Sequence, residues 1–170
     1  MVVQSMVQRN QNRSIFFYLY TLVMQNRIQI SNEYSSLLVQ TTIHHILKHG
    51  KKVLATNLLV KALKQLDESK ESQLEVLHLA VHNATPTVEV KPKRFGGSVY
   101  QVPITVTDTR GTSLAIRWIL HAALQRDGSC YEDKLAKELQ DAAQNIGSAI
   151  RKKEEVERMA QANKAFAHLA

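Results

Sequence analysis

The segment 87–107 is the part of the chain whose residue types are best suited to chemistry on a ligand. Its distal half carries three cations and two aromatic residues: Lys91, Lys93, Arg94, Phe95 and Tyr100. Cations neutralise phosphates and aromatic rings stack on unpaired bases, so an exposed segment of this kind suits RNA. The same residues also suit a solvated hairpin whose lysine-rich edge discourages aggregation, and the segment alone does not decide between the two.

Two histidine pairs are the other candidates for chemistry. His45 and His49, and His78 and His82, have the i, i+4 spacing that lets two side chains share a metal ion. Neither pair contains the glutamate of the His-Glu-x-x-His pattern, so helix-surface histidines are the preferred interpretation. Cys130 has no base near it in the sequence and is expected to be an inert thiol. The residues therefore predict no catalytic site, no metal and no cofactor.

Short basic clusters outside this segment extend the RNA hypothesis along the chain. The formal net charge is +7, and between residues 91 and 126 the only acid is Asp108. Each cluster alone is usually solvated surface, but several on one compact domain favour a polyanionic partner. Together with Phe95 and Tyr100, the side chains expected to contact RNA are Lys48, Lys51, Lys52, Lys91, Lys93, Arg94, Arg110, Arg117, Arg151, Lys152, Lys153, Arg158 and Lys164.

A β-hairpin over 87–107 is the element predicted to carry the basic, aromatic segment. Val88 and Val90, and then the apolar residues of 102–106, alternate with other residues as they do in strands. The pair Gly96-Gly97 supplies the positive φ angles that reverse the chain. Because two strands are not stable alone in water, the hairpin must project from a helical body.

Six helices are expected to form that body, near 32–49, 53–67, 72–85, 110–126, 131–146 and from 154 onward. Residues 72–75, Ser-Gln-Leu-Glu, form a capping box for the third helix. The fourth is apolar on most sides and should be central. The cluster 151–153 is interpreted as a linker. The acids of the fifth helix are assigned to its solvated face: Glu132, Asp133, Glu138 and Asp141.

The chain is interpreted as an N-terminal extension, residues 1–30, followed by one helical domain, residues 31–170. Ser31 is placed at the cap of the first helix. Residues 15–24 form an apolar run that is too short to span a bilayer, and the extension is expected to dock on a partner. The single cysteine favours a reducing compartment. The basic, acid-free start suits organelle import, and its retained Met1 favours an organelle-encoded or uncleaved protein.

The segment 93–103, Lys-Arg-Phe-Gly-Gly-Ser-Val-Tyr-Gln-Val-Pro, resembles the hairpin of the small-subunit ribosomal protein seven family of bacteria and organelles. The similarity covers roughly residues 35–168 with the family's order and spacing. Further segments that resemble the family lie at 49–52, 114–118, 141–143, 150–155 and 158–168.

The resemblance implies a bundle of six helices with a protruding β-ribbon, and an architectural role without catalysis. It implies binding to the 3′ domain of small-subunit rRNA, nucleation of head assembly, and a ribbon that reaches the exit-site tRNA and the mRNA path. Neighbouring ribosomal proteins of the head and platform are further implied partners, and a membrane is not. The alternatives are a metal- or thiol-dependent enzyme, which needs polar groups converging in a concave site, and a helical adaptor that binds only proteins.

Three departures from the family's pattern point to a divergent organellar ribosome with extra protein partners. The basic N-terminal arm is replaced by a more apolar extension with only Arg9, Arg13 and Arg27. Phe95 stands where an aliphatic residue is usual, and the ending 168–170 lacks the usual aromatic-Arg pair. The weakened arm favours a mitochondrial ribosome, with a plastid ribosome as the alternative.

Overall fold

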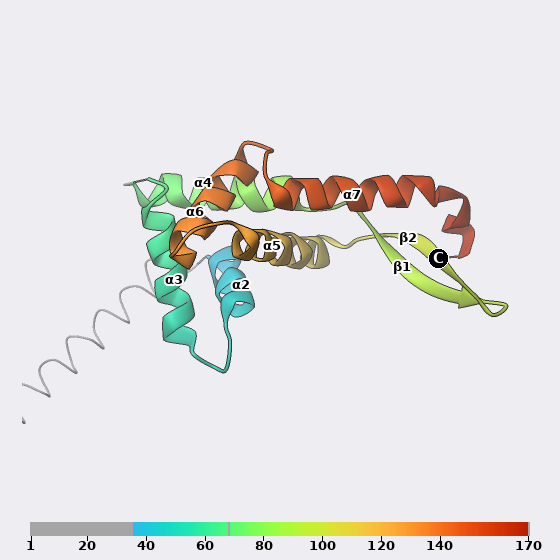
Figure 1. Ribbon diagram of the computed structural model, residues 1–170, viewed down its shortest axis with the longest axis horizontal. Helices are drawn as coiled ribbons and strands as arrows, with labels where there is room; N and C mark the ends of the chain where they lie inside the picture. Colours follow the sequence, from blue (N-terminus) through green and yellow to red (C-terminus); the bar gives the residue numbers. More distant parts are fainter. Residues whose placement is uncertain (1–35, 68, 170) are drawn as a thin grey trace, which may run out of the picture. The chain divides into compact units, whose positions relative to one another are not determined.

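The computed structural model describes residues 36–67 and 69–169 (Figure 1). The chain divides into two compact units, residues 1–40 and residues 41–170, and the second holds all of the elements discussed below except the start of α2. The predicted extension 1–30 and the cap at Ser31 lie outside the described residues.

Helices dominate the described residues, and a single hairpin interrupts them. The six α-helices are α2 (Leu37–Ile46), α3 (Lys52–Lys64), α4 (Lys70–Ala84), α5 (Asp108–Gln125), α6 (Tyr131–Ala143) and α7 (Ser148–Ala162). A 3-10 helix, η1 (Lys164–Leu169), follows α7, and β1 (Val88–Phe95) pairs with β2 (Ser98–Thr105). This architecture confirms the predicted mainly α fold of six helices and one β-hairpin.

Helix α5 packs inside the helical body, as its apolar sequence predicts, and shares this central position with α6. It packs against α4, α6 and α7, and Ala115, Ile116 and Ile119 are buried on it. Its first turn comes close to the end of α4: a Cβ on Gly111 would lie 2.9 Å from Cγ2 of Thr85. Since that contact is shorter than side chains tolerate, the position requires glycine, and the glycine fixes where the start of α5 lies beside the hairpin.

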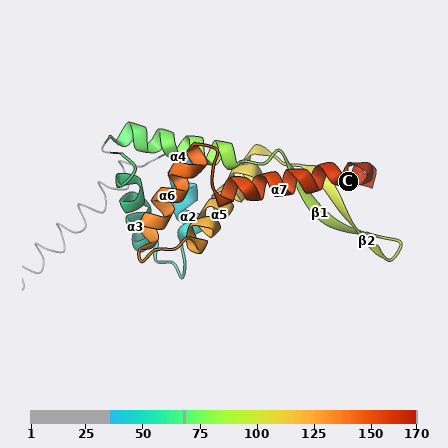
Figure 2. The same ribbon diagram turned by 45° about the horizontal axis from the view of Figure 1, so that its top comes forward.

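The hairpin closes through Gly96 and Gly97, whose φ angles of 54° and 91° are those of a two-residue turn of the primed type. Its register runs from Val88 opposite Thr105 to Phe95 opposite Ser98. The hairpin is not isolated, because α7 and η1 lie along it, as Figures 1 and 2 show. Val102 of β2 is fully buried. The bodies of the strands are therefore supported by helices, while the tip is exposed.

Helix α4 begins earlier than predicted. Its first residue is Lys70 and Ser69 precedes it, so the capping box at 72–75 is wrong and Ser72 lies within the helix. Glu71 lies in the first turn, where a negative charge favours the positive end of the helix dipole. Gln73 is buried and its amide donates to the Asp67 carbonyl at 2.7 Å, so the polar pattern of 72–75 reflects loop packing.

Helix α7 also begins earlier than predicted, at Ser148, so the linker assigned to 151–153 is wrong. The start follows Gly147, whose φ of 108° turns the chain after α6. The backbone N–H of Ala149 donates to Oε1 of Glu138 at 3.1 Å. A carboxylate on α6 therefore accepts a hydrogen bond from the first turn of α7. No side-chain cap next to this position in the sequence indicates that a helix begins here.

The buried position of Glu138 also corrects the assignment of the α6 acids to a solvated face. Glu138 is fully buried, and Nε of Arg126 lies 2.5 Å from Oε2 of Glu138. Burial alone would lower the pKa of Arg126, but its hydrogen bonds to Asp141 and Glu138 outweigh that effect and raise it. Glu132 and Asp133 remain nearer the surface, where they contact side chains of α3.

Candidate nucleic-acid interface

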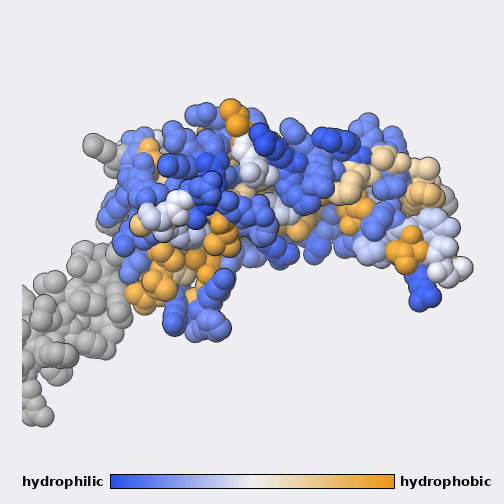
Figure 3. All heavy atoms as spheres, in the orientation of Figure 1, coloured by the Kyte–Doolittle hydropathy of each residue, from blue (hydrophilic) through white to orange (hydrophobic). Residues whose placement is uncertain are grey.

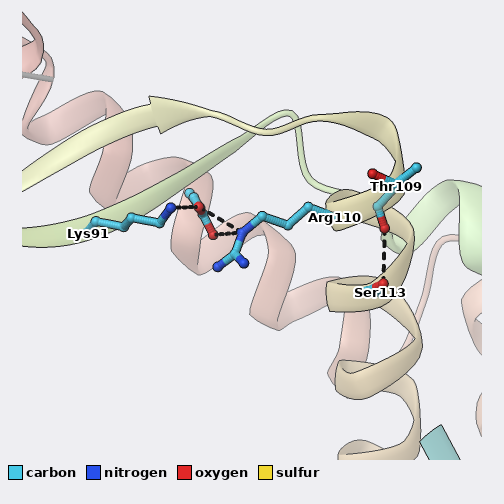
Figure 4. Close-up of polar contacts among 5 residues, drawn as sticks. Lys91, Thr109, Arg110 and Ser113 are labelled. Carbon is cyan, nitrogen blue, oxygen red and sulfur yellow. Dashed lines mark hydrogen bonds and ion pairs between the residues drawn. The ribbon is translucent and has the colours of Figure 1, made fainter. Parts of the chain in front are cut away.

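A carboxylate joins the base of the hairpin to the first turn of α5. Glu89 is largely buried on β1, and both of its oxygens lie 2.9 Å from Nε of Arg110. Nζ of Lys91 lies 2.8 Å from Oε1 of the same carboxylate. Figure 4 shows Lys91 and Arg110 approaching it from two different elements. Two predicted RNA-binding cations, 19 residues apart in sequence, are thereby brought together.

Glu89 orients Arg110 without neutralising the whole group. Arg110 is bound through Nε, and no described residue hydrogen-bonds to its two terminal nitrogens, which point away from the carboxylate in Figure 4. The side chains of Arg110 and Lys91 are 52% and 45% exposed. Two cations and one anion leave a net positive charge. The edge of the Arg110 guanidinium that carries the two terminal nitrogens has the geometry that matches a phosphate.

The charge on Glu89 is well stabilised in the folded chain. Burial raises its pKa, but hydrogen bonds from Lys91 and Arg110, together with the positive charge of both, lower it overall. Glu89 is therefore ionised at neutral pH and holds both cations in place. No local pattern indicates this role beyond the placement of Glu89 between two valines of a strand.

A polar stripe on α5 connects this cluster with two others. Its members recur at helical spacing and are mostly exposed: Arg110, Ser113, Arg117, His121 and Gln125. Burial and then the nearby charge of Arg117 lower the pKa of His45, which places the middle of the stripe beside α2. His121 and Gln125 share a hollow with Lys152 of α7. The stripe therefore borders the hairpin, the first basic turn and the start of α7.

The first basic turn, between α2 and α3, exposes Lys48, Lys51 and Lys52. Lys48 and Lys51 edge a hollow of about 340 Å³ that also includes His45 and His49. Its remaining lining is mainly aliphatic and comes from α3 and α5, with Tyr131, whose pKa is raised by burial. The hollow therefore combines a mainly aliphatic lining with polar side chains from residues 45–51 and Tyr131.

An exposed apolar patch lies next to the first basic turn. Figure 3 shows it over the region of α3, where Val53 and Leu54 are exposed. His45 and His49 contribute to the neighbouring hollow, yet nowhere among residues 36–67 and 69–169 do three His, Cys, Asp or Glu side chains gather as metal ligands would. None of the described helices is long and apolar enough to cross a bilayer.

The predicted cations of α7 divide into two kinds. Arg151, Lys152 and Arg158 are exposed, and Lys152 pairs with Glu155 at 2.7 Å. Lys153 is only half exposed, and its ammonium donates to the Asn83 carbonyl at the end of α4 at 2.8 Å. Lys153 therefore holds α7 against α4. Lys164, in η1, is exposed.

The two predicted stacking rings lie in different surroundings. Phe95, beside the hairpin turn, is 41% exposed. Tyr100 packs on Phe166 of η1, with ring centroids 5.2 Å apart. Tyr100 therefore contacts η1, which follows α7. Phe166 was not identified from the sequence as its partner, since nothing local links residues so far apart.

Comparison with known proteins identifies the class as a structural protein of the small ribosomal subunit. The family model described as "Ribosomal protein S7p/S5e" matches residues 20–164. The chain is 52% identical over 137 residues to small ribosomal subunit protein uS7c of Nephroselmis olivacea, covering 80% of this chain and 88% of that protein. It is 47% identical over 148 residues to uS7 of Arthrospira platensis, covering 86% of this chain and 95% of that one.

A third relative, uS7 of Nostoc punctiforme, is 49% identical over 148 residues and covers 86% and 95% of the two chains. The chain therefore belongs to the S7p/S5e family of ribosomal proteins. This confirms the resemblance found in its motifs. Membership makes it a component of the translation machinery with a structural role and not an enzyme.

Proposed function

We propose that this protein binds the 3′ domain of small-subunit rRNA and nucleates assembly of the subunit head. The observation that carries the proposal is the cluster of Lys91, Glu89 and Arg110, in which a largely buried carboxylate presents two exposed cations from different elements. Oriented guanidinium groups bind phosphates in two-pronged contacts, and positioning by a fixed anion reduces the entropy lost on binding.

The stripe on α5 extends this phosphate-binding surface. It brings the hairpin cluster, the first basic turn and the start of α7 next to one helix. RNA affinity depends on the number of phosphates neutralised at once, so dispersed clusters joined by folding favour binding to a folded RNA domain. We assign the predicted cations to this surface, with Lys153 acting mainly through its contact with α4.

The tip of the hairpin is assigned to exit-site tRNA and the mRNA path. Beyond its supported base it exposes Arg94, Phe95 and Val99. A ring and an adjacent guanidinium can contact a nucleotide from two sides, by stacking and by phosphate contact. Neighbouring ribosomal proteins of the head and platform are further partners, and the apolar patch at Val53 and Leu54 is available for such contacts.

The proposed location is a plastid ribosome. The relatives include the chloroplast-type uS7c of Nephroselmis olivacea and cyanobacterial uS7 proteins at about half identity. This similarity favours the plastid alternative over the mitochondrial location that the weakened basic arm suggested.

The rRNA assignment is tested by the salt dependence of binding between the full chain and a transcript of the 3′ domain. With six to ten phosphate contacts, log K against log[salt] should have a slope of roughly −5 to −9. Arg110→Ala should make that slope shallower by about 1. Lys61→Ala is the matched control, because Lys61 is exposed on α3, pairs with Glu132 and lies outside the predicted clusters.

A slope near zero for the unmodified chain would refute rRNA binding through phosphates. Equal slopes for Arg110→Ala and Lys61→Ala would refute the assignment of the Arg110 cluster while leaving rRNA binding itself standing.

A further inference from the structure

A polar hollow lies between the second half of α5 and the start of α7. Its volume is about 260 Å³, and its lining is Trp118, His121, Ala122, Gln125, Ser148 and Lys152. The four residues of α5 share one helix face, and the two of α7 are one turn apart. Pockets for drug-sized ligands usually measure about 300–1,000 Å³, so this hollow suits a smaller group.

The polar groups of this hollow are free to bind a ligand. The indole N–H of Trp118, the imidazole of His121, the amide of Gln125 and the hydroxyl of Ser148 make no hydrogen bond with any residue in 36–67 or 69–169. In the same residues no buried side-chain polar atom lacks a partner, so these groups reach accessible space.

We infer that this hollow holds one unpaired nucleotide of the rRNA, an inference that rests on the proposed function. The rings of Trp118 and His121 offer faces for a base, and the amide of Gln125 can both donate to and accept from a base edge. Lys152 also lines the hollow, and its ammonium can contact the phosphate of that nucleotide. Its exposed pair with Glu155 is a weak interaction that a phosphate can displace.

A nucleotide fits these features better than a peptide does. The hollow continues the polar stripe of α5 toward Arg117, and Arg151 is exposed one residue before Lys152. Aromatic rings beside a cation are the combination that binds single-stranded nucleic acids. The hollow beside the first basic turn also contains histidines and lysines, but most of its lining is aliphatic.

The chain supplies its own probe, because Trp118 is its only tryptophan. The fluorescence of the full chain is followed during titration with the 3′-domain transcript, and affinity is measured separately by filter binding. We expect saturating quenching of Trp118 at one RNA per protein. Gln125→Ala and His121→Ala should each reduce affinity by roughly three- to tenfold and weaken the quenching.

Gln144→Ala is the matched control, because Gln144 is exposed at the end of α6 and lies outside the hollow. Normal, salt-dependent RNA binding without a change in Trp118 fluorescence would overturn the inference and leave the proposed function intact. The nucleotide site is likewise overturned, with the proposed function intact, if Gln125→Ala and Gln144→Ala bind RNA alike. Absence of salt-dependent binding by the unmodified chain would overturn the proposed function, and the nucleotide site with it.

Discussion

Glu138→Ala should destabilise the fold far more than removal of Glu132, an acid of the same helix whose side chain is partly exposed. The Glu138 carboxylate is fully buried, lies 2.5 Å from Nε of Arg126 and accepts the N–H of Ala149 at 3.1 Å. It therefore has two structural tasks at once: it pairs with a partly buried charge and it completes the first turn of α7.

The expected loss follows from those two contacts. Removing one partner of a buried ion pair costs about 3–5 kcal/mol, and the lower end applies because Arg126 keeps Asp141 and is 25% exposed. An unsatisfied N–H at Ala149 adds about 1–3 kcal/mol. A total of about 4 kcal/mol would lower the melting temperature by roughly 8–16 °C in a chain of this size. Glu138→Gln should lose about 1 kcal/mol less than Glu138→Ala, because its amide oxygen can still accept from Ala149 while the charge that pairs with Arg126 is gone.

The free energy of unfolding is measured on the full chain by urea titration, with thermal melting as a second readout. Glu132→Ala is the control, since Glu132 lies on the same helix and makes a 3.5 Å surface pair with Lys61 that is worth at most about 1 kcal/mol. If Glu138→Ala loses no more stability than Glu132→Ala, the buried pair does not hold α6 and α7 together and the reasoning fails. Loss of equal size in Glu138→Gln and Glu138→Ala would refute the role assigned to Ala149.

Three further predictions concern the hairpin. Because the pKa of Glu89 is lowered in the folded chain, the stability that its carboxylate contributes is present above the usual pKa of 4.5 and is lost as pH falls through the lowered pKa. The difference in free energy of unfolding between the unmodified chain and Glu89→Gln, measured in urea, should therefore shrink in acid. A difference that stays constant would contradict this. Phe166→Ala should remove about 0.5–1.5 kcal/mol of ring contact with Tyr100 and speed hydrogen exchange in β2 while α5 stays protected. Unchanged exchange in β2 would count against that support. Replacing residues 94–99 with Asn-Gly removes the exposed tip, keeps Lys91 and leaves Lys93 opposite Tyr100. This change should cost the domain about 1 kcal/mol and mainly impair exit-site tRNA retention; normal retention with failed head assembly would make the tip an rRNA anchor.

Local chemistry made the hairpin and the helices predictable. Alternating valines identify the strands, and Gly96-Gly97 identifies a reversal that few other pairs permit. The apolar residues of 114–122 likewise identify a helix buried on most sides. In each case the signal lies within a few residues of its consequence, so a single sequence is enough.

The errors at α7 and at the acids of α6 arose where a residue of another element determines the structure. α7 starts at Ser148 because Glu138 of the preceding helix accepts its first-turn N–H, and no local cap marks that position. One signal for the buried acid was available: Glu138 lies three residues after Leu135 and four before Ala142, on the apolar face of α6. Similarly, sequence reasoning found Lys91 and Arg110 as cations but not the Glu89 contact that unites them, because pairing across elements depends on the folded chain.

Two carboxylates thus serve opposite purposes in one basic protein. Glu138 is shielded from water with most of its charge balanced by Arg126, so it fixes helix geometry and contributes little to the outer field. Glu89 pairs with two cations that remain about half exposed. It cancels one positive charge of the pair, and both cations stay oriented toward solvent. An acid placed as Glu89 is weakens long-range attraction to RNA slightly, yet it favours a defined contact geometry over loose association.

Glu89→Gln should therefore raise the net positive charge and still reduce discrimination between the cognate rRNA and an unrelated RNA of equal length, because Arg110 would be freed from its fixed orientation. Equal or improved discrimination by Glu89→Gln would show that charge alone, and not orientation, governs binding at this cluster.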